Sequence, residues 1–595
     1  MLKPRRGLAA GVTGVALALV LAACGGGSSG GGTGASGDKT AVKGGVLNML
    51  GAGDVTYLDP NVSYYSLDYM AERMYTRQPY TNPAIEGQST KPVADLAEGD
   101  PVVTDSGKTV TIKLRTGVQW NSTPPRDVVG EDLVRGLKYA CNPAQPFGGL
   151  PDFIDLFVGY KAFCDGFAKV GQTAAAMAAY ANSHQVEGIQ QGANAQEVVF
   201  KLTHPASYLK DMMTLVTFSP RPKEYDAYVP ASLELYQHLL SIGPYKIESY
   251  VPTKSLTYVR NDVWKADTDP VRKAYVDKIV VNQTLTQESV QQQLETGTPT
   301  ADTQWDVHTP ASQIPGLLAK KDPNLVFGET SSSNPYVVFN NVSPNNGGAM
   351  QKVEFRKALM QAINRDNLIQ DLGGPSLNTA LTQVLPSNIV GGEQKIDLYK
   401  YDPEAAKKAI AGLGLQNVTL KLLYRNANEG SRKEFATMQQ DLAKAGINLV
   451  GVPSPNADFY SKYLQVPDVA KRGVWDLSTA GWGSDWYGNA ALSYMGPLWS
   501  GQAAFPPIGS NFGFYENPKT NDLITQATLA QNLDQAKNLW HQADQQIMQD
   551  AAFFPITNPK GTVYHATQVH NCFYMDVFQM CDPTNVWLDK NTQGG

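Results

Sequence analysis

Alternation between strand-like and helix-like segments is the feature that most limits how this 595-residue chain can fold. Residues 418–424 and 447–452 have the composition of strands, and residues 403–411 and 431–444 carry apolar side chains at helical spacing. Similar alternation begins near residue 43 and continues along the chain. Mixed order of this kind predicts an α/β protein rather than an all-α or all-β one.

The other predicted elements follow from the same two periodicities. A hairpin is expected where 102–103 and 109–115 flank a turn at 105–108. We expect further strands at 43–50, 197–202, 335–340 and 475–479, and two strands within 242–261. We expect further helices at 66–77, 126–140, 173–181, 287–294 and 355–370.

Length and charge limit the class of protein. A chain of 595 residues is too long for one hydrophobic core, so two to four domains are expected. The composition, 42% hydrophobic and 17% charged, is typical of a globular protein. The net charge of −6 would be about −9 without Lys3, Arg5 and Arg6. A negative charge argues against nucleic acid and anionic lipid as partners.

The first 24 residues have the pattern of a targeting segment. A basic start is followed by an apolar run at 8–20, which is too short to span a bilayer comfortably. The run ends in Leu21-Ala22-Ala23-Cys24, which resembles a bacterial lipobox and implies cleavage before Cys24 and lipidation of its sulfur. Residues 25–41 are rich in Gly and Ser and are expected to form a flexible tether. The alternative is an ordinary secretory peptide with an incidental cysteine.

Four further cysteines, Cys141, Cys164, Cys572 and Cys581, suit an oxidising compartment. They form no CxxC motif and have no His at metal-ligand spacing, so disulfides are favoured over a zinc site. Of the three possible pairings we favour the local one, Cys141 with Cys164 and Cys572 with Cys581. Free buried thiols are the alternative.

Residues 475–488 (WDLSTAGWGSDWYG) are the candidate ligand-binding stretch. A short strand is expected to lead into a Gly-rich loop that carries Trp482, Asp485, Trp486 and Tyr487. One carboxylate among aromatic rings could hold a cationic, partly apolar ligand. The alternative is that the tryptophans belong to the core and Asp485 caps a loop.

Five segments in order resemble one protein family. The first two are PVADLAEGDPVVTDSGKTVTIKLRTGVQW at 92–120, and GPYKIESY with YVRNDVW at 243–264. The other three are YVVFNN with FRKALMQAINRDNLI at 336–369, YDPEAAKKAI at 401–410, and the stretch at 475–488. Together they look like the extracytoplasmic oligopeptide- and dipeptide-binding proteins of ABC importers, solute-binding family five.

That resemblance implies a two-lobed fold like that of periplasmic binding proteins, of type II and hinged, with an extra subdomain in the first lobe. The chain would cross between the lobes near 327–335 and 553–556. We expect the first lobe on 42–85, 216–320 and 555–595, the extra subdomain on 86–215, and the second lobe on 321–554.

The resemblance also implies roles for individual residues. The family's Trp-x-x-Asp pattern, in which the aspartate binds the peptide amine, corresponds to Trp482 and Asp485. Dipeptide binders resemble this chain at Arg425, where their arginine meets the ligand carboxylate. Family members often follow the aspartate with an acidic residue and Pro, whereas this chain continues Trp486-Tyr487-Gly488-Asn489. Tyr336 and Tyr64 are further candidates for contacts to the peptide.

The implied function is capture of peptides by a lipid-anchored protein and their delivery to the permease subunits of an ABC importer. The protein would be a monomer on the outer face of the bacterial cytoplasmic membrane, held through its lipid anchor only, without cofactor, metal or enzymatic activity. A second hypothesis is a non-peptide ligand on the same scaffold, such as a nickel chelate, haem or an oligosaccharide. A secreted hydrolase is a third, although the sequence contains no HExxH motif and no credible catalytic triad.

Overall fold

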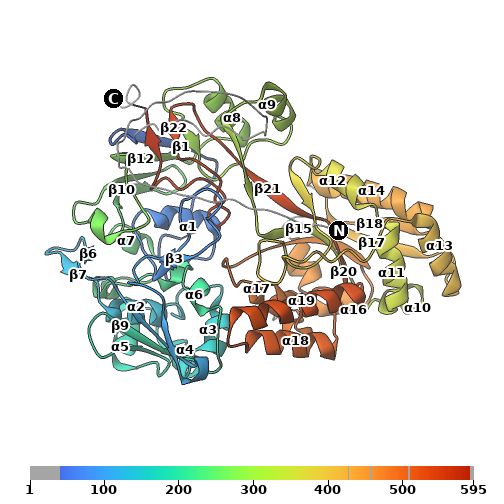
Figure 1. The fold of residues 1–595 in the computed structure, drawn as a ribbon, viewed down its shortest axis with the longest axis horizontal. Helices are drawn as coiled ribbons and strands as arrows, with labels where there is room; N and C mark the ends of the chain where they lie inside the picture. The colour runs from blue at the N-terminus through green and yellow to red at the C-terminus, as the bar shows by residue number, and fades with distance from the viewer. Residues whose placement is uncertain (1–40, 56, 427, 456–457, 507–508, 590–595) are drawn as a thin grey trace, which may run out of the picture. The chain divides into compact units, whose positions relative to one another are not determined.

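The computed structural model describes residues 41–589 except 56, 427, 456–457 and 507–508, and its strands and helices alternate along the chain (Figure 1). The predicted targeting segment, Cys24 and all of the predicted tether except residue 41 lie outside the described residues. No helix in the described ranges has both the length and the hydrophobicity that a membrane span requires.

The first large sheet has the strand order β10-β11-β12-β1-β13. β1 pairs in parallel with β12 and β13, whereas β11 pairs antiparallel with β10 and β12. Ile279 and Val281 of β12 are buried at alternate positions, as expected of a strand with one face on a core. The strands are β1 (Val46–Leu50), β10 (Tyr245–Val251), β11 (Ser255–Arg260), β12 (Lys278–Asn282) and β13 (Thr303–Gln304). The helices nearby in sequence are α1 (Ser66–Arg73), α7 (Leu233–Tyr236), α8 (Gln287–Glu295) and α9 (Ile314–Lys320).

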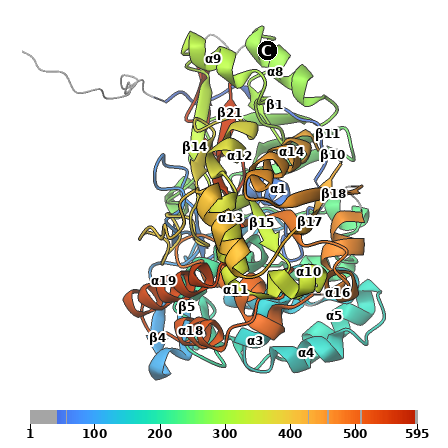
Figure 2. The same cartoon turned by 90° about the vertical axis from the view of Figure 1, so that its right-hand side faces the viewer.

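The second large sheet has the order β18-β17-β19-β15-β20 and carries most of the C-terminal half of the chain. α14 packs against β17 and β18 (Figure 2). The strands are β15 (Ser332–Phe339), β17 (Thr419–Arg425), β18 (Asn448–Ser454), β19 (Leu477–Gly483) and β20 (Phe553–Pro555). The helices are α10 (Asn345–Gly348), α11 (Val353–Ala362), α12 (Arg365–Asp371), α13 (Pro403–Gly412), α14 (Glu429–Lys444), α16 (Pro467–Lys471), α17 (Leu492–Trp499), α18 (Pro518–Thr528) and α19 (Leu533–Gln549), with a π-helical turn at Phe459–Leu464.

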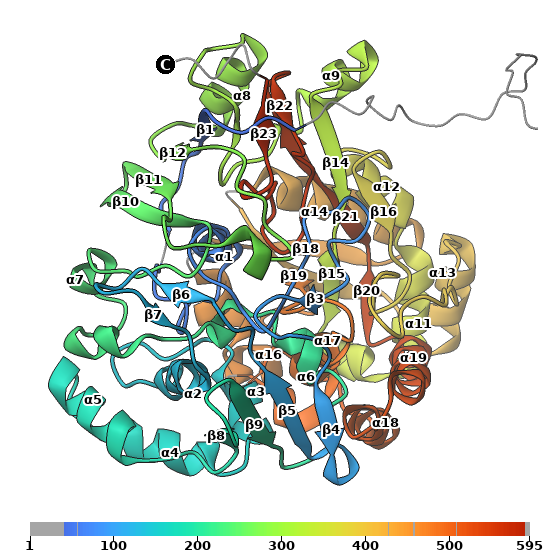
Figure 3. The same cartoon turned by 60° about the vertical axis from the view of Figure 1, so that its left-hand side comes forward.

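A smaller antiparallel sheet, β4-β5-β9-β8, forms a third group with α2–α5 beside it (Figure 3). A disulfide joins Cys141, just after α2, to Cys164 in α4. The strands are β4 (Val102–Thr104), β5 (Thr109–Lys113), β8 (Ile189–Gln191) and β9 (Glu197–Lys201). The helices are α2 (Gly130–Tyr139), α3 (Leu150–Leu156), α4 (Tyr160–Phe167), α5 (Ala174–Ser183) and α6 (Leu209–Met212).

Two long strands connect these groups. β14 (Leu325–Glu329) pairs antiparallel with β21 (Thr557–Tyr564), and each continues directly into or from a strand of the second sheet, β15 or β20. Of the two segments in which the chain was expected to cross between lobes, 327–335 contains parts of β14 and β15, and 553–556 contains β20. The remaining short strands are β2 (Tyr80–Thr81), β3 (Val93–Ala94), β6 (Gln119–Trp120), β7 (Arg126–Asp127), β16 (Asn378–Ala380), β22 (Val569–His570) and β23 (Trp587–Leu588).

The predicted hairpin is confirmed, because β4 and β5 pair antiparallel around residues 105–108. The prediction of one helix over 355–370 is wrong. α11 ends at Ala362, Ile363 adopts an extended conformation, and Asn364 then caps α12 by accepting hydrogen bonds from the backbone N–H groups of Asp366 and Asn367. Two helices are shorter than predicted: α1 ends at Arg73 rather than at residue 77, and α2 begins at Gly130 rather than at residue 126.

The expectation that Trp482 lies in a loop is also wrong. β19 continues through Gly483 because it pairs with β15, with Trp482 opposite Ser333 and Gly483 opposite Ser332. Gly481 permits this close approach, since a Cβ atom there would lie 2.3 Å from the side-chain oxygen of Asn334. The aromatic residue is therefore fixed by a sheet rather than by a loop.

Candidate functional site

The end of β19 opens onto a cavity of about 730 Å³, which is within the size range of small-ligand sites. Segments far apart in the sequence meet around it, including the start of α1, the ends of β17 and β19, the linking strands β14, β15 and β21, and the loop before β23. Five predicted site residues line it: Tyr64, Arg425, Trp482, Asp485 and Tyr487.

Asp485 follows the end of β19 and is half-buried at the cavity wall. The Tyr64 hydroxyl donates a hydrogen bond to its carboxylate at 2.8 Å. In the described part of the chain, no Lys or Arg forms a salt bridge with it. Burial raises the pKa of Asp485 to about 6, and the bond from Tyr64 opposes that rise. Asp485 is thus an acid that would gain from a cationic ligand.

Ser493 of α17 holds the segment that carries Asp485. The indole N–H of Trp482 donates to the Ser493 backbone oxygen at 2.8 Å, and the Asp485 backbone N–H donates to its hydroxyl at 3.4 Å. Tyr64 is held from the other side, where its ring packs edge-on against Phe147 with the centroids 5.3 Å apart. Tyr64 and Asp485, which are hydrogen-bonded to each other, are therefore both held in position by neighbouring residues.

Arg425, the last residue of β17, provides a positive charge in the same cavity. Its guanidinium carbon lies 4.5 Å from the ring centroid of Phe459 and 5.1 Å from that of Tyr460. Within the described ranges, no carboxylate forms a salt bridge with it. The aromatic rings orient this guanidinium while leaving it without an anionic partner.

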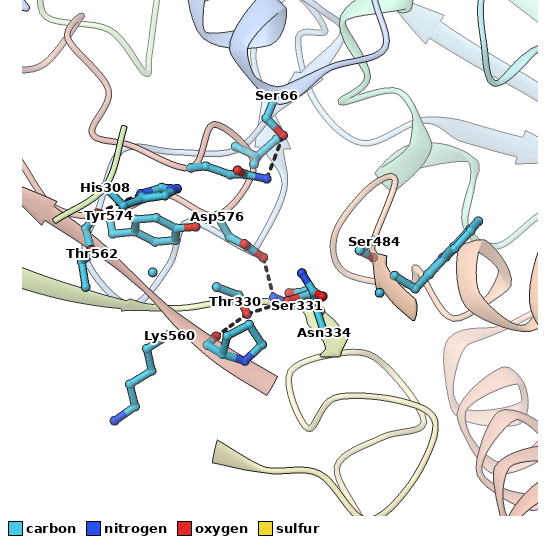
Figure 4. A pocket seen from close by; sticks show the side chains of 18 of the residues that line it. Ser66, His308, Thr330, Ser331, Asn334, Ser484, Lys560, Thr562, Tyr574 and Asp576 are labelled. Atoms are coloured by element: carbon cyan, nitrogen blue, oxygen red, sulfur yellow. Dashed lines mark hydrogen bonds between the residues drawn. The ribbon is translucent and has the colours of Figure 1, made fainter. Parts of the chain in front are cut away.

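Asp576 is a second carboxylate on the cavity wall and was not anticipated from the sequence. It accepts a hydrogen bond from the backbone N–H of Ser331 (Figure 4). The side chain of Tyr487 is a further donor to this carboxylate. Burial raises its pKa to about 6, and these donors oppose the rise. The only sequence signal was its position between Cys572 and Cys581, which the structure joins in a disulfide.

Tyr574 forms the wall beside Asp576 (Figure 4). Its ring lies against Gly328 of β14 and Gly561 of β21, which pair directly with each other. A Cβ atom at Gly328 or Gly561 would lie 2.4 Å or 1.9 Å from the Tyr574 ring. These glycines are required because the ring rests on bare backbone. Other lining residues missed by the sequence reasoning are Thr309, Thr330, Ser331, Lys560 and Thr562.

The structure does not bring Trp486 or Tyr336 to the cavity. Trp486 is buried, stacks on Tyr208 with the ring centroids 6.0 Å apart, and donates its indole N–H to the Asn489 backbone oxygen at 2.9 Å. Tyr336 packs against Phe553 in the sheet. Both were predicted as ligand contacts. Tyr336 is buried in β15, because a strand turns alternate residues to opposite faces, whereas Trp486 lies beyond the end of β19 and packs against Tyr208.

In the described ranges, no three His, Cys, Asp or Glu side chains come together as the ligands of a metal ion would. The cavity lining contains a single histidine, His308, whose Nδ1 lies 3.2 Å from the Thr562 backbone oxygen. Burial lowers the pKa of His308, which favours its neutral form.

Comparison with known proteins assigns the chain to a family. The model of the bacterial extracellular solute-binding proteins, family 5, matches residues 91–506. This chain belongs to that family. The predicted α/β, two-lobed fold of periplasmic binding proteins is confirmed by a solved structure, clavulanic acid biosynthesis oligopeptide binding protein 2. That structure covers 92% of this chain, and this chain covers 96% of it, at 21% identity and a TM-score of 0.81.

Two relatives indicate the range of ligands among proteins similar to this family 5 chain. A probable di/tripeptide-binding protein 5 of Pseudomonas aeruginosa is 24% identical over 477 residues, which are 77% of this chain and 80% of the relative. A heme-binding protein A of Haemophilus influenzae is 22% identical over 471 residues, which are 77% and 78% of the two chains. Solute-binding proteins of this family are transporter components, which argues against an enzyme.

Proposed function

We propose that this protein captures peptides in the cavity at Asp485 and delivers them to an ABC importer. The observation that carries the proposal is that a carboxylate, Asp485, and a guanidinium, Arg425, lie on the wall of a single cavity, and neither forms a salt bridge with another described residue. A free peptide carries the two complementary charges. The similarity to a di/tripeptide-binding protein supports the same ligand class.

The energetics favour this pairing. Burying an ammonium group without an anion is prohibitively costly, so a closed peptide site needs an acidic partner for the amine. A contact of about 4 Å at an effective dielectric constant near 20 contributes roughly 4 kcal/mol before desolvation costs. Asp485 would bind the amine, with Tyr64 and Trp482 beside it, and Arg425 would bind the carboxylate. Tyr487 would contribute to the site indirectly, through its hydrogen bond to the Asp576 carboxylate.

We also propose the lobe boundaries that the sequence suggested: a first lobe on 42–85, 216–320 and 555–595, its subdomain on 86–215, and a second lobe on 321–554. The paired strands β14 and β21 support this division, because they connect the two large sheets. The Tyr64–Asp485 bond would then join the lobes, and rotation about the linking strands would open the cavity. We propose that the protein acts as a monomer.

Attachment to the membrane is proposed from the sequence pattern alone. Lipidation of Cys24, with residues 25–41 as a tether, would hold the body in water at the outer face of the cytoplasmic membrane. That position would place the loaded protein beside the permease subunits of its importer.

A non-peptide ligand is the second candidate, and the haem-binding relative is the observation that favours it. The lining argues for a peptide, since haem sites are mainly apolar whereas this cavity presents hydroxyl, amide and charged groups. A nickel chelate or an oligosaccharide would leave Asp485 without a cationic partner of its own.

Native mass spectrometry of the protein purified from cells tests the proposal, because a retained ligand would reveal its mass. We expect masses of short peptides, which unfolding should release. A single non-peptide mass would overturn the proposal. Calorimetry with tri-alanine is the second test, and absence of any binding across a panel of di- to pentapeptides would also contradict it.

A further inference from the structure

The Asp576 carboxylate lies on the cavity wall and can accept more hydrogen bonds than the described residues supply. The carboxylate is half-buried and accepts from the Ser331 backbone N–H and from Tyr487. An ionised carboxylate can accept about four hydrogen bonds, so the donors of Ser331 and Tyr487 leave capacity for a ligand.

Some buried carboxylates of the same body are neutralised by arginine, whereas Asp476 and Asp544 are buried without a salt bridge to any described residue and accept hydrogen bonds from N–H and O–H groups. Asp59, Asp95, Asp269 and Asp582 each lie 2.8–3.4 Å from a guanidinium nitrogen. In the described part of the chain, no Lys or Arg forms a salt bridge with Asp576 or Asp485. The cavity therefore holds two carboxylates without internal counter-ions, whereas a peptide amine would satisfy one.

The surroundings of Asp576 also suit a cation. The Tyr574 ring lies beside the carboxylate, and a positive group gains from both an aromatic face and an anion. Two basic residues of the lining do not act as counter-ions to Asp576. The side chain of Lys560 points away from Asp576 (Figure 4), and burial favours the neutral form of His308 by lowering its pKa.

An independent observation indicates that this part of the cavity is built for a polar ligand. Thr309 lines the same cavity and is only 4% exposed, yet its hydroxyl has no hydrogen-bond partner among the described residues. Buried hydroxyl groups are normally paired, and a ligand amine or amide could supply the missing partner.

We propose that Asp576 binds a cationic side chain of the ligand, so that the cavity prefers peptides with a Lys or Arg side chain in addition to a free amine. This inference rests on the proposed function, in which Asp485 binds the amine. The competing explanation is that Asp576 only holds Ser331 and Tyr487 in place, which predicts no preference for basic peptides.

Calorimetry with matched tripeptides distinguishes the two. Lys-Ala-Ala, Ala-Lys-Ala and Ala-Ala-Lys are compared with their norleucine counterparts, which have a similar side chain without the charge. We expect at least one lysine peptide to bind the wild-type protein about tenfold more tightly than its counterpart. Asp576→Asn should reduce that ratio below about threefold, and Asp576→Glu should restore part of it.

Equal affinities for lysine and norleucine peptides in the wild-type protein would overturn the inference even if Asp576→Asn failed to fold. An unchanged ratio in a folded Asp576→Asn protein would overturn it as well. Peptide binding without basic preference refutes only the role of Asp576. Absence of binding by every tripeptide refutes the proposed peptide function and this inference with it.

Discussion

The Tyr64 hydroxyl donates to the Asp485 carboxylate at 2.8 Å across a sequence separation of 421 residues. The bond fixes one carboxylate oxygen and leaves the other open to the cavity. It also assists ionisation of an acid whose burial disfavours the charged form. An amine ligand would therefore meet an oriented, partly desolvated anion.

Replacing Asp485 by Asn should weaken binding of every peptide with a free amine by roughly 2 to 4 kcal/mol, about thirty- to a thousand-fold. The reason is that the amide keeps the shape but removes the charge that balances the ammonium group. Calorimetry with tri-alanine measures the effect. Asp262→Asn, at an exposed surface carboxylate, is the matched control and should leave affinity unchanged. Equal affinity of wild type and Asp485→Asn would refute the assignment.

Peptide affinity should fall as the pH drops through about 6. The pKa of Asp485 in the unliganded protein is about 6, so protons compete with the amine below that pH, while the amine itself stays charged. Tyr64→Phe removes a bond that lowers this pKa, so the midpoint should move to higher pH. Affinities measured between about pH 5 and 8 test both statements. A flat profile would contradict them.

Arg425→Met should abolish discrimination between a free and an amidated C-terminus. In the wild-type protein we expect the free acid to bind about tenfold more tightly, because a charge-assisted hydrogen bond forms only with the carboxylate. Lys560→Met changes the other basic residue of the lining and serves as the control. If Lys560→Met rather than Arg425→Met removes the discrimination, the carboxylate binds at Lys560.

Loss of one disulfide should mainly reduce stability, whereas loss of the other should mainly change peptide affinity. Replacing Cys141 and Cys164 by Ser opens a loop of 23 residues and should lower the free energy of unfolding by about 3 kcal/mol. The Cys572–Cys581 bridge spans only 9 residues, so its loss should cost less stability but disturb the loop that carries Asp576. Guanidinium denaturation and peptide calorimetry on both double variants provide the comparison. Equal effects on affinity would contradict this division.

Cys24→Ser should prevent lipidation and release the protein into the medium or leave its leader uncleaved. The sulfur of Cys24 is the proposed attachment atom. Fractionation of cells, with intact-mass measurement of the recovered protein, tests this. A Cys24→Ser protein that remains processed and membrane-bound would refute the anchor.

Local patterns predicted several strands, several helices and the family, since these depend on periodicity and on motifs within short stretches. Asp485 and Arg425 were found through such motifs, and the structure places both on one cavity wall. Asp576 and Tyr574 carry no local signal beyond lying between Cys572 and Cys581, because their position in the cavity depends on the pairing of β14 with β21. Trp486 and Tyr336 lie outside the cavity lining, which the sequence could not indicate because local patterns do not reveal which side chains face the core.

The glycine pair beneath Tyr574 has a practical consequence for protein engineering. Gly328 does not line the cavity, yet any larger residue there would push the ring and the adjoining Asp576 loop inward. Ligand preference should therefore be adjustable by substitutions at Gly328, a residue that does not contact the bound molecule.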